Sequence, residues 1–244
     1  MFPEIIKDTE PDLGLHNRDP QATNRIIQGG TWKKQRTVML LPSAPMVPMK
    51  CALTWMSMIT PPNQPFVRWA LLGDEVGVAY SNAIDAILAN PDLSQWEYVL
   101  TVEHDNTVPP DGFLKLIKRM EEHLEFACIG GLYWLKGPGG QPQIWGDIKD
   151  PVVNYRPQPP VPGQLIECYG TGMGFNLWRM SMFRDLKKKG VKGPWFKTRA
   201  SSTEGVGTQD LYFWGDIARP NGFRCAIDCD VLVGHMDPAS GIVW

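Results

Sequence analysis

Short apolar runs alternate with helical patterns along the first half of the chain. Apolar runs at 37–41, 66–72, 96–102 and 126–133 predict buried strands. Between them, apolar residues recur at helical spacing over 49–59, 78–88 and 112–123, and prolines mark the boundaries of these segments. This strand–helix alternation predicts an α/β domain with a mostly parallel central sheet flanked by helices.

Two of the predicted helices carry an apolar face. In 49–59 the residues at near-helical spacing are Met49, Leu53, Met56 and Ile59, which we expect to face the core. In 78–88 the expected inward residues are Ile84, Ile87 and Leu88.

The remaining segments set the domain organisation. Residues 1–35 are polar and contain several prolines and glycines, so we expect an arm that precedes one domain over 36–244. Residues 136–163 are rich in Pro and Gly, with little periodicity, and predict a long surface loop over the active site.

Charge and cysteine content narrow the class of protein. A net charge of -2, from 24 basic and 26 acidic residues, gives no overall attraction to nucleic acid or anionic lipid. Five widely spaced cysteines predict no disulfide framework, and Cys225 and Cys229 lack a second ligand pair at zinc-site spacing. No run reaches the roughly 18 apolar residues that span a bilayer, and the acidic N-terminus has no signal core. We therefore expect a soluble, intracellular protein in the cytoplasm, or in the host cytoplasm if the chain is viral.

Two carboxylates follow the third predicted strand. Glu103 and Asp105 are one residue apart, so strand alternation points both to the same side. A divalent cation is the usual partner of two crowded carboxylates, and it would also neutralise a departing diphosphate. The alternative is a solvated acidic turn before Pro109.

Two more polar positions sit at the boundaries of predicted elements. Asp210 lies in the first turn of a predicted helix, where the helix dipole would keep it ionised; the alternative is a simple helix cap. His235 follows an apolar run at 229–233, where a neutral imidazole can ligate a metal; the alternative is a structural histidine.

The order of these motifs resembles the GT-A glycosyltransferases, in particular the family-2-like group, from residue 37 to residue 237. Glu103-His104-Asp105 resembles the D-x-D motif, with Glu in place of the first Asp, and 171–175 resembles the acceptor-side segment. Thr208-Gln209-Asp210 resembles the E-D motif, with Gln209 in place of the usual acid. Asn221-Gly222-Phe223 and Val233-Gly234-His235 fit the segments that follow in that family.

The resemblance implies a single Rossmann-like GT-A domain and a metal-dependent hexosyl- or pentosyltransferase. It implies Mn²⁺ or Mg²⁺ held by Asp105 and His235 with help from Glu103, and Asp210 as the base of an inverting displacement. The implied donor-binding residues are Pro42, Ser43, Ala44, Glu75, Asn82, Glu103 and His104. The implied acceptor-binding residues are Gly131, Tyr133, Trp134, Gly172, Met173 and Trp214, and the further tryptophans Trp145 and Trp195 are expected near the same cleft.

Other functions remain open at this point. The acceptor is a glycan, a small molecule or a hydroxylated DNA base, as in viral DNA-modifying glycosyltransferases. A catalytically silent sugar- or nucleotide-binding module would fit Gln209. A nucleotidyltransferase is disfavoured, because the loop after the first strand has no basic residue before Lys50.

Overall fold

The structure is a computed structural model that describes residues 34–44, 46–62, 64–201 and 205–244. Residues from Gln35 onward form one compact unit. The predicted arm 1–35 lies outside the described residues, apart from Lys34 and Gln35. In the described part, no helix has the length and apolar character needed to cross a membrane.

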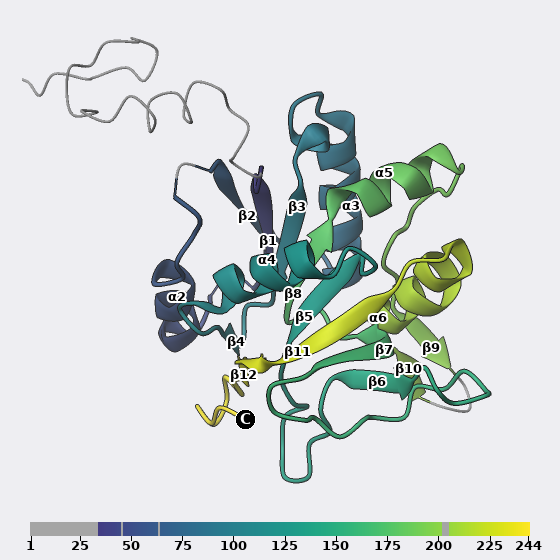
Figure 1. Cartoon of the computed structure of the whole chain (residues 1–244). Coiled ribbons are helices and arrows are strands. Elements are labelled where there is room, and N and C mark those ends of the chain that lie inside the picture. The colour runs from purple at the N-terminus through teal and green to yellow at the C-terminus, as the bar shows by residue number, and fades with distance from the viewer. Residues whose placement is uncertain (1–33, 45, 63, 202–204) are drawn as a thin grey trace, which may run out of the picture. The chain divides into compact units, whose positions relative to one another are not determined.

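An eight-stranded sheet runs through the domain in the order β2-β1-β3-β8-β5-β11-β7-β6 (Figure 1). Its strands are β1 (Thr37–Ser43), β2 (Phe66–Leu72), β3 (Tyr98–Val102), β5 (Cys128–Leu132), β6 (Ile144–Asp147), β7 (Leu165–Thr171), β8 (Phe175–Arg179) and β11 (Cys225–Leu232). The two-stranded pairs outside it are β4 (Asn106–Thr107) with β12 (Gly234–His235), and β9 (Arg199–Ser201) with β10 (Gly205–Gly207).

The sheet is mixed, so the prediction of a mostly parallel sheet holds only for some of its strand pairs. β1 pairs parallel with β2 and β3, and β5 with β11. β8 enters antiparallel between β3 and β5, and β7 and β6 continue antiparallel beyond β11. Because β6 lies inside 136–163, that segment is only partly a loop.

Helices cover both faces of the sheet because the strand residues alternate between two apolar clusters. The helical segments are α2 (Met49–Met56), α3 (Val76–Ala89), η1 (Leu93–Gln95), α4 (Gly112–Glu122), α5 (Met180–Lys188), α6 (Gln209–Tyr212), the π-helical segment η2 (Phe213–Ala218) and η3 (Arg219–Asn221). Val38 and Leu40 join the cluster under α3, α5 and η2, whereas Met39 joins the cluster under α2 and α4. The predicted helices α3, α2 and α4 each close part of one cluster, and α5 and η2 complete the cover of the first.

The predicted core face of α2 is wrong. Met49, Leu53 and Met56 are 69%, 56% and 77% exposed, whereas Cys51 and Trp55 are buried. The indole Nε1 of Trp55 donates to the backbone carbonyl of Asn106 at 2.9 Å, which turns this side of the helix inward.

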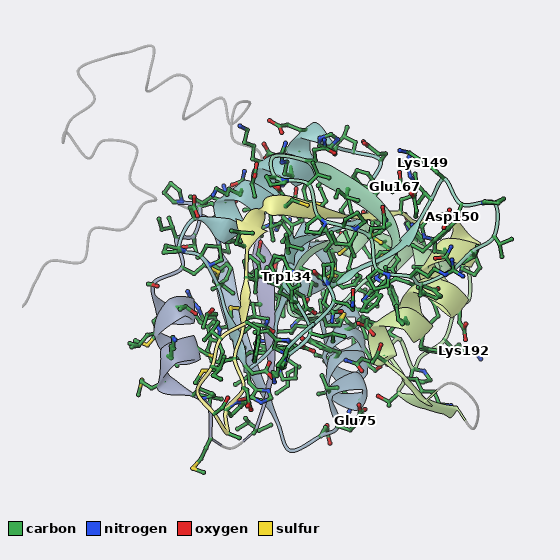
Figure 2. The ribbon with its side chains drawn as sticks, turned by 90° about the horizontal axis from the view of Figure 1, so that it is seen from below. Glu75, Trp134, Lys149, Asp150, Glu167 and Lys192 are labelled. Carbon is green, nitrogen blue, oxygen red and sulfur yellow. The ribbon has the colours of Figure 1, made fainter. Side chains whose placement is uncertain are left out.

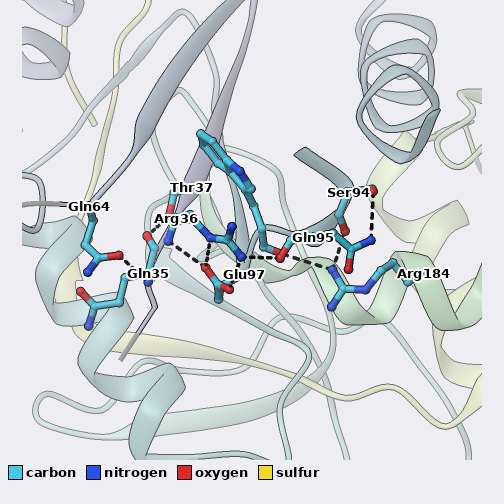
Figure 3. A network of polar contacts seen from close by, with 9 residues as sticks. Gln35, Arg36, Thr37, Gln64, Ser94, Gln95, Glu97 and Arg184 are labelled. Atoms are coloured by element: carbon cyan, nitrogen blue, oxygen red, sulfur yellow. Dashed lines mark hydrogen bonds and ion pairs between the residues drawn. The ribbon is translucent and has the colours of Figure 1, made fainter. Parts of the chain in front are cut away.

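A polar network at the amino ends of β1 and β3 holds these strands in register (Figure 3). The Arg36 guanidinium pairs with Glu97 at 2.9 Å and donates to the carbonyl of Gln95 at 2.8 Å. Arg184 of α5 donates to the carbonyl of Ser94 at 2.7 Å. With their amino ends fixed, both strands deliver their carboxyl ends to the same edge of the sheet.

Three cysteines form a row across neighbouring strands. Cys225 of β11 lies opposite Cys128 of β5 and Cys168 of β7. All three side chains are fully buried, and the Sγ atoms of Cys168 and Cys225 are 4.0 Å apart. Burial raises the pKa of the Cys128 and Cys225 thiols well above the usual range, so these thiols stay protonated.

Candidate active site

A pocket of about 460 Å³ opens at the carboxyl ends of the parallel strands β1, β2 and β3. It is lined by Pro42, Ser43, Ala44, Gly73, Asp74, Val76, Glu103, His104 and Asp105. Ligands of open α/β sheets bind at this edge, outside the strand ends. The pocket is therefore the first candidate for a binding site.

Most of the donor residues predicted from the sequence line this pocket, but two of them do not. Glu75 caps α3, where its carboxylate accepts from the N–H groups of Gly77 and Val78 at 3.0 and 3.1 Å. In Figure 2, Glu75 lies at the edge of the molecule and Trp134 lies near its middle. Asn82 is exposed and donates to Asp74 at 3.4 Å, so it reaches the pocket only through that residue.

Asp105 has two cationic or potentially cationic neighbours. The Lys136 ammonium donates to Asp105 Oδ2, and His235 Nε2 lies 3.6 Å from the same oxygen. Burial opposes the ionisation of Asp105, but the contacts with His235 and Lys136 outweigh it and hold the pKa of this carboxyl below its usual range. Asp105 is consequently a carboxylate at neutral pH.

A backbone contact sets the tautomer of His235. Its Nδ1 lies 2.8 Å from the carbonyl oxygen of Trp134, which can only accept, so Nδ1 carries the hydrogen. In the neutral ring the Nε2 lone pair then points toward Asp105. As an imidazolium the ring donates from Nε2 to Asp105 and lowers the pKa of that carboxyl; as a neutral ring it offers the Nε2 lone pair to a divalent cation beside the same oxygen.

Asn106 joins the two segments that carry Asp105 and His235. It is fully buried, and its Nδ2 donates to the carbonyl of Gly234 at 3.1 Å. The N–H of Met236 donates to the backbone carbonyl of Asp105 at 2.7 Å. These contacts bring two residues that lie 130 positions apart in the sequence to one point.

Glu103 behaves differently from Asp105. Burial raises the pKa of Glu103 to about 8, and the negative charges of Asp105 and Asp210 act in the same direction. Lys136 opposes the shift. Without an added cation, Glu103 is therefore mostly protonated at neutral pH.

Asp210 is 6% exposed and lies in the first turn of α6, as the sequence predicts. Its Oδ1 accepts from the N–H of Leu211 at 2.9 Å, and the Thr208 hydroxyl bonds to the same carboxyl group. Burial nevertheless raises the pKa of Asp210, and these hydrogen bonds only reduce the shift. The hydrogen bonds at the helix start therefore offset only part of the cost of burying this carboxyl group.

Most of the predicted acceptor residues are buried. Tyr133, Met173 and Trp214 are 3%, 1% and 0% exposed. The Tyr133 hydroxyl accepts from the N–H of Gly174 at 3.0 Å, and a Cβ at Gly172 would stand 2.1 Å from that hydroxyl. These glycines make room for Tyr133, so they serve packing in this structure.

The predicted tryptophans divide between the core and the rim. Trp214 stacks on Trp178 with ring centroids 5.5 Å apart, and Trp195 is also buried, so both belong to the core. Trp134 and Trp145 are half-buried, and Gly131 packs against β11. Two predicted aromatic residues contact His235: the Tyr133 ring packs edge-to-face on the imidazole with centroids 5.5 Å apart, and the Trp134 backbone carbonyl accepts from Nδ1.

The structure adds three residues that the sequence analysis missed. Asp74 lies two residues after the end of β2, and the strand-end rule applied to that strand would have found it. Lys136 and Asn106 depend on contacts across 31 and 128 positions, respectively, for which the sequence carries no local signal. Among the described residues, no three His, Cys, Asp or Glu side chains are arranged to hold a metal ion, so Asp105 and His235 stand as a pair.

Comparison with known proteins gives the class of fold. No protein-family model matches the chain, and no curated protein matches it. Among solved structures, A197 from STIV is similar, with a TM-score of 0.55 and 17% identity over 83% of this chain and 86% of that one. The likeness supports a Rossmann-like α/β fold with a large mixed sheet in a single domain.

Proposed function

We propose that this protein is a glycosyltransferase that moves a sugar from a nucleotide-sugar donor to an acceptor hydroxyl. The observation that carries the proposal is the pocket at the ends of β1, β2 and β3, walled by Glu103, His104 and Asp105. The fold likeness to A197 from STIV supports the α/β fold on which this pocket is built. Strand-end carboxylates beside such a pocket suit the binding of a nucleoside diphosphate through a cation.

In this proposal the loop Pro42–Ala44 and the Gly73-Asp74 turn hold the nucleoside. Asp105 and His235 would hold Mn²⁺ or Mg²⁺, with Glu103 beside them. Such an ion supplies positive charge to the diphosphate leaving group. Ionisation of Glu103 next to a cation would reverse the pKa shift that burial causes in its absence.

Asp210 is the proposed general base. Its raised pKa makes it a stronger proton acceptor than an exposed aspartate, and its charge acts on Glu103, so the two carboxyl groups lie within electrostatic range. The acceptor hydroxyl gives its proton to Asp210 while its oxygen bonds to the anomeric carbon. The bond from that carbon to the diphosphate oxygen breaks on the opposite face, so the configuration inverts.

The test is a panel of nucleotide sugars and nucleoside diphosphates with Mn²⁺, read by melting temperature and by release of nucleoside diphosphate. A donor at one hundred times its Kd should add about 2.7 kcal/mol to the free energy of unfolding. Release is measured with water alone and with glycan, small-molecule and hydroxylated-base acceptors. Binding without release would identify a sugar- or nucleotide-binding module, and neither binding nor release would overturn the proposal.

A further inference from the structure

Lys136 lies on a short hairpin that is tied to both members of the Asp105–His235 pair. Two backbone hydrogen bonds close the hairpin. The N–H of Leu135 donates to the backbone carbonyl of Gln141, and the N–H of Gln143 donates to the backbone carbonyl of Tyr133, each at 2.9 Å. Its tip turns through Gly137 and Gly139, both at positive φ. The hairpin therefore projects Lys136 from a defined base.

The hairpin meets the candidate site at two points. The Trp134 carbonyl accepts from His235 Nδ1, and two residues later the Lys136 ammonium donates to Asp105. Lys136 and His235 approach the same oxygen of Asp105, Oδ2. A cation bound between Asp105 and His235 would contact Oδ2 of Asp105, the oxygen that the Lys136 ammonium already contacts.

The charges around Asp105 make this contact more than a surface ion pair. The side chains of Lys136 and Asp105 are 32% and 12% exposed, so solvent screens the pair only in part. Glu103 is half-buried in the same pocket, Asp210 is buried within electrostatic range of it, and Lys136 lowers the pKa of Glu103. The ammonium thus supplies positive charge to the same carboxyl groups that a divalent cation would neutralise.

We propose that Lys136 is a tethered counter-ion that competes with a divalent cation for Asp105. This inference rests on the proposed function, because it concerns the same cation site. The hairpin must withdraw the ammonium from Asp105 before that carboxylate can ligate an ion. Lys136 therefore weakens binding of the bare ion and favours binding when a second anion, the donor diphosphate, is present to take up the released ammonium.

The experiment measures Mn²⁺ binding to the full chain without nucleotide, by the electron paramagnetic resonance signal of free Mn²⁺. Lys136→Met removes the charge with little change in length, and we expect the Kd for Mn²⁺ to fall about tenfold. Lys136→Arg keeps the charge and should keep the wild-type Kd. Adding Asp105→Asn to Lys136→Met should abolish the gain.

Lys188→Met is the matched control, because Lys188 also pairs with an aspartate, Asp185 at 3.5 Å, on the separate helix α5. It should leave the Kd for Mn²⁺ unchanged. An unchanged or raised Kd in Lys136→Met would overturn the inference, and so would an absence of Mn²⁺ binding in every variant. The nucleotide-sugar assay reports separately on the proposed function. Donor turnover together with an unchanged Kd for Mn²⁺ in Lys136→Met would overturn the inference about Lys136 alone. A lowered Kd for Mn²⁺ without turnover would overturn the transferase proposal alone.

Discussion

Asp105 and Asp210 are both almost fully buried carboxyl groups, yet their environments shift their pKa values in opposite directions. Asp105 lies at a strand end with an ammonium and an imidazole on one of its oxygens, and its pKa is lowered. Asp210 lies at a helix start with a hydroxyl and backbone N–H groups as partners, and its pKa is raised. Neutral hydrogen bonds do not offset the burial of a carboxylate here, whereas a nearby cation does.

This difference is consistent with the separate roles proposed for the two aspartates. A carboxylate that stays ionised suits the binding of a cation, and one with a raised pKa suits the acceptance of a proton. Substitutions at the two positions should therefore separate binding from turnover.

The largest expected effect is that of Asp210→Asn. The amide cannot take the acceptor proton, so kcat should fall about 10²–10⁴-fold. The donor Kd should stay near the wild-type value, as measured by thermal shift or calorimetry. Retained turnover in this variant would remove Asp210 from the role of base.

Asp105→Asn should instead act on binding. If Asp105 is the proposed ligand, its loss should weaken Mn²⁺-dependent donor binding by at least about tenfold to a hundredfold, since even the outer partners of metal ligands contribute that much. Calorimetric titration of the donor with and without Mn²⁺ measures the effect. Equal donor affinity in wild type and variant, with Mn²⁺ present, would contradict the assignment of Asp105.

Glu103→Gln tests a third carboxyl group, whose pKa is raised by burial although Lys136 is near. The readout is the pH dependence of the free energy of unfolding of the metal-free protein. The pKa of Glu103 is raised from 4.5 to about 8, so between these values the unfolded chain releases a proton that the folded protein keeps. The wild-type contribution to the free energy of unfolding therefore falls as pH rises through this window. The predicted quantity is the free energy of unfolding of Glu103→Gln minus that of wild type. Discounted for partial exposure, this difference should increase by about 1–2 kcal/mol between pH 5 and pH 8.

Urea denaturation at pH 5 and pH 8 measures this difference. The control is Glu122→Gln on α4, whose side chain is 44% exposed. The difference in free energy of unfolding between Glu122→Gln and wild type should be the same at both pH values. A Glu103→Gln variant that follows the control would show that Glu103 is ionised across the whole range.

The smallest expected effect is that of Thr208→Val, which removes a neutral partner from Asp210. The Thr208 hydroxyl lowers the pKa of Asp210, so its loss should raise that pKa and move the acidic limb of the pH–rate profile upward. The rate at pH 5 should fall by less than about tenfold, because a neutral hydrogen bond contributes about 0.5–1.5 kcal/mol. An unshifted acidic limb would mean that Asp210 does not control it.

The sequence predicts the first half of the sheet better than the second. β1, β2 and β3 are short, largely apolar runs that pair in parallel with helices between them, a pattern that hydrophobicity alone reveals. β8 is also apolar, but its place between β3 and β5 comes from pairing with both neighbours. No local pattern distinguishes that insertion from a parallel extension of the sheet.

The face of α2 shows a second limit. Met49, Leu53 and Met56 have helical spacing, but Cys51, Trp55 and Met58 have the same spacing on another side. The contact of Trp55 with Asn106, 51 positions away, selects the second set. In the site, the same reasoning explains why Asp105 was predictable from its own strand while Lys136 was not.

The row formed by Cys128, Cys225 and Cys168 has a practical consequence. The thiols are fully buried and spread over three central strands, so a thiol reagent in solution can reach them only when those strands separate. Their alkylation rate in native buffer therefore reports the opening of the sheet itself. The native cysteines therefore serve as a built-in probe of unfolding kinetics, and no added label or engineered residue is needed.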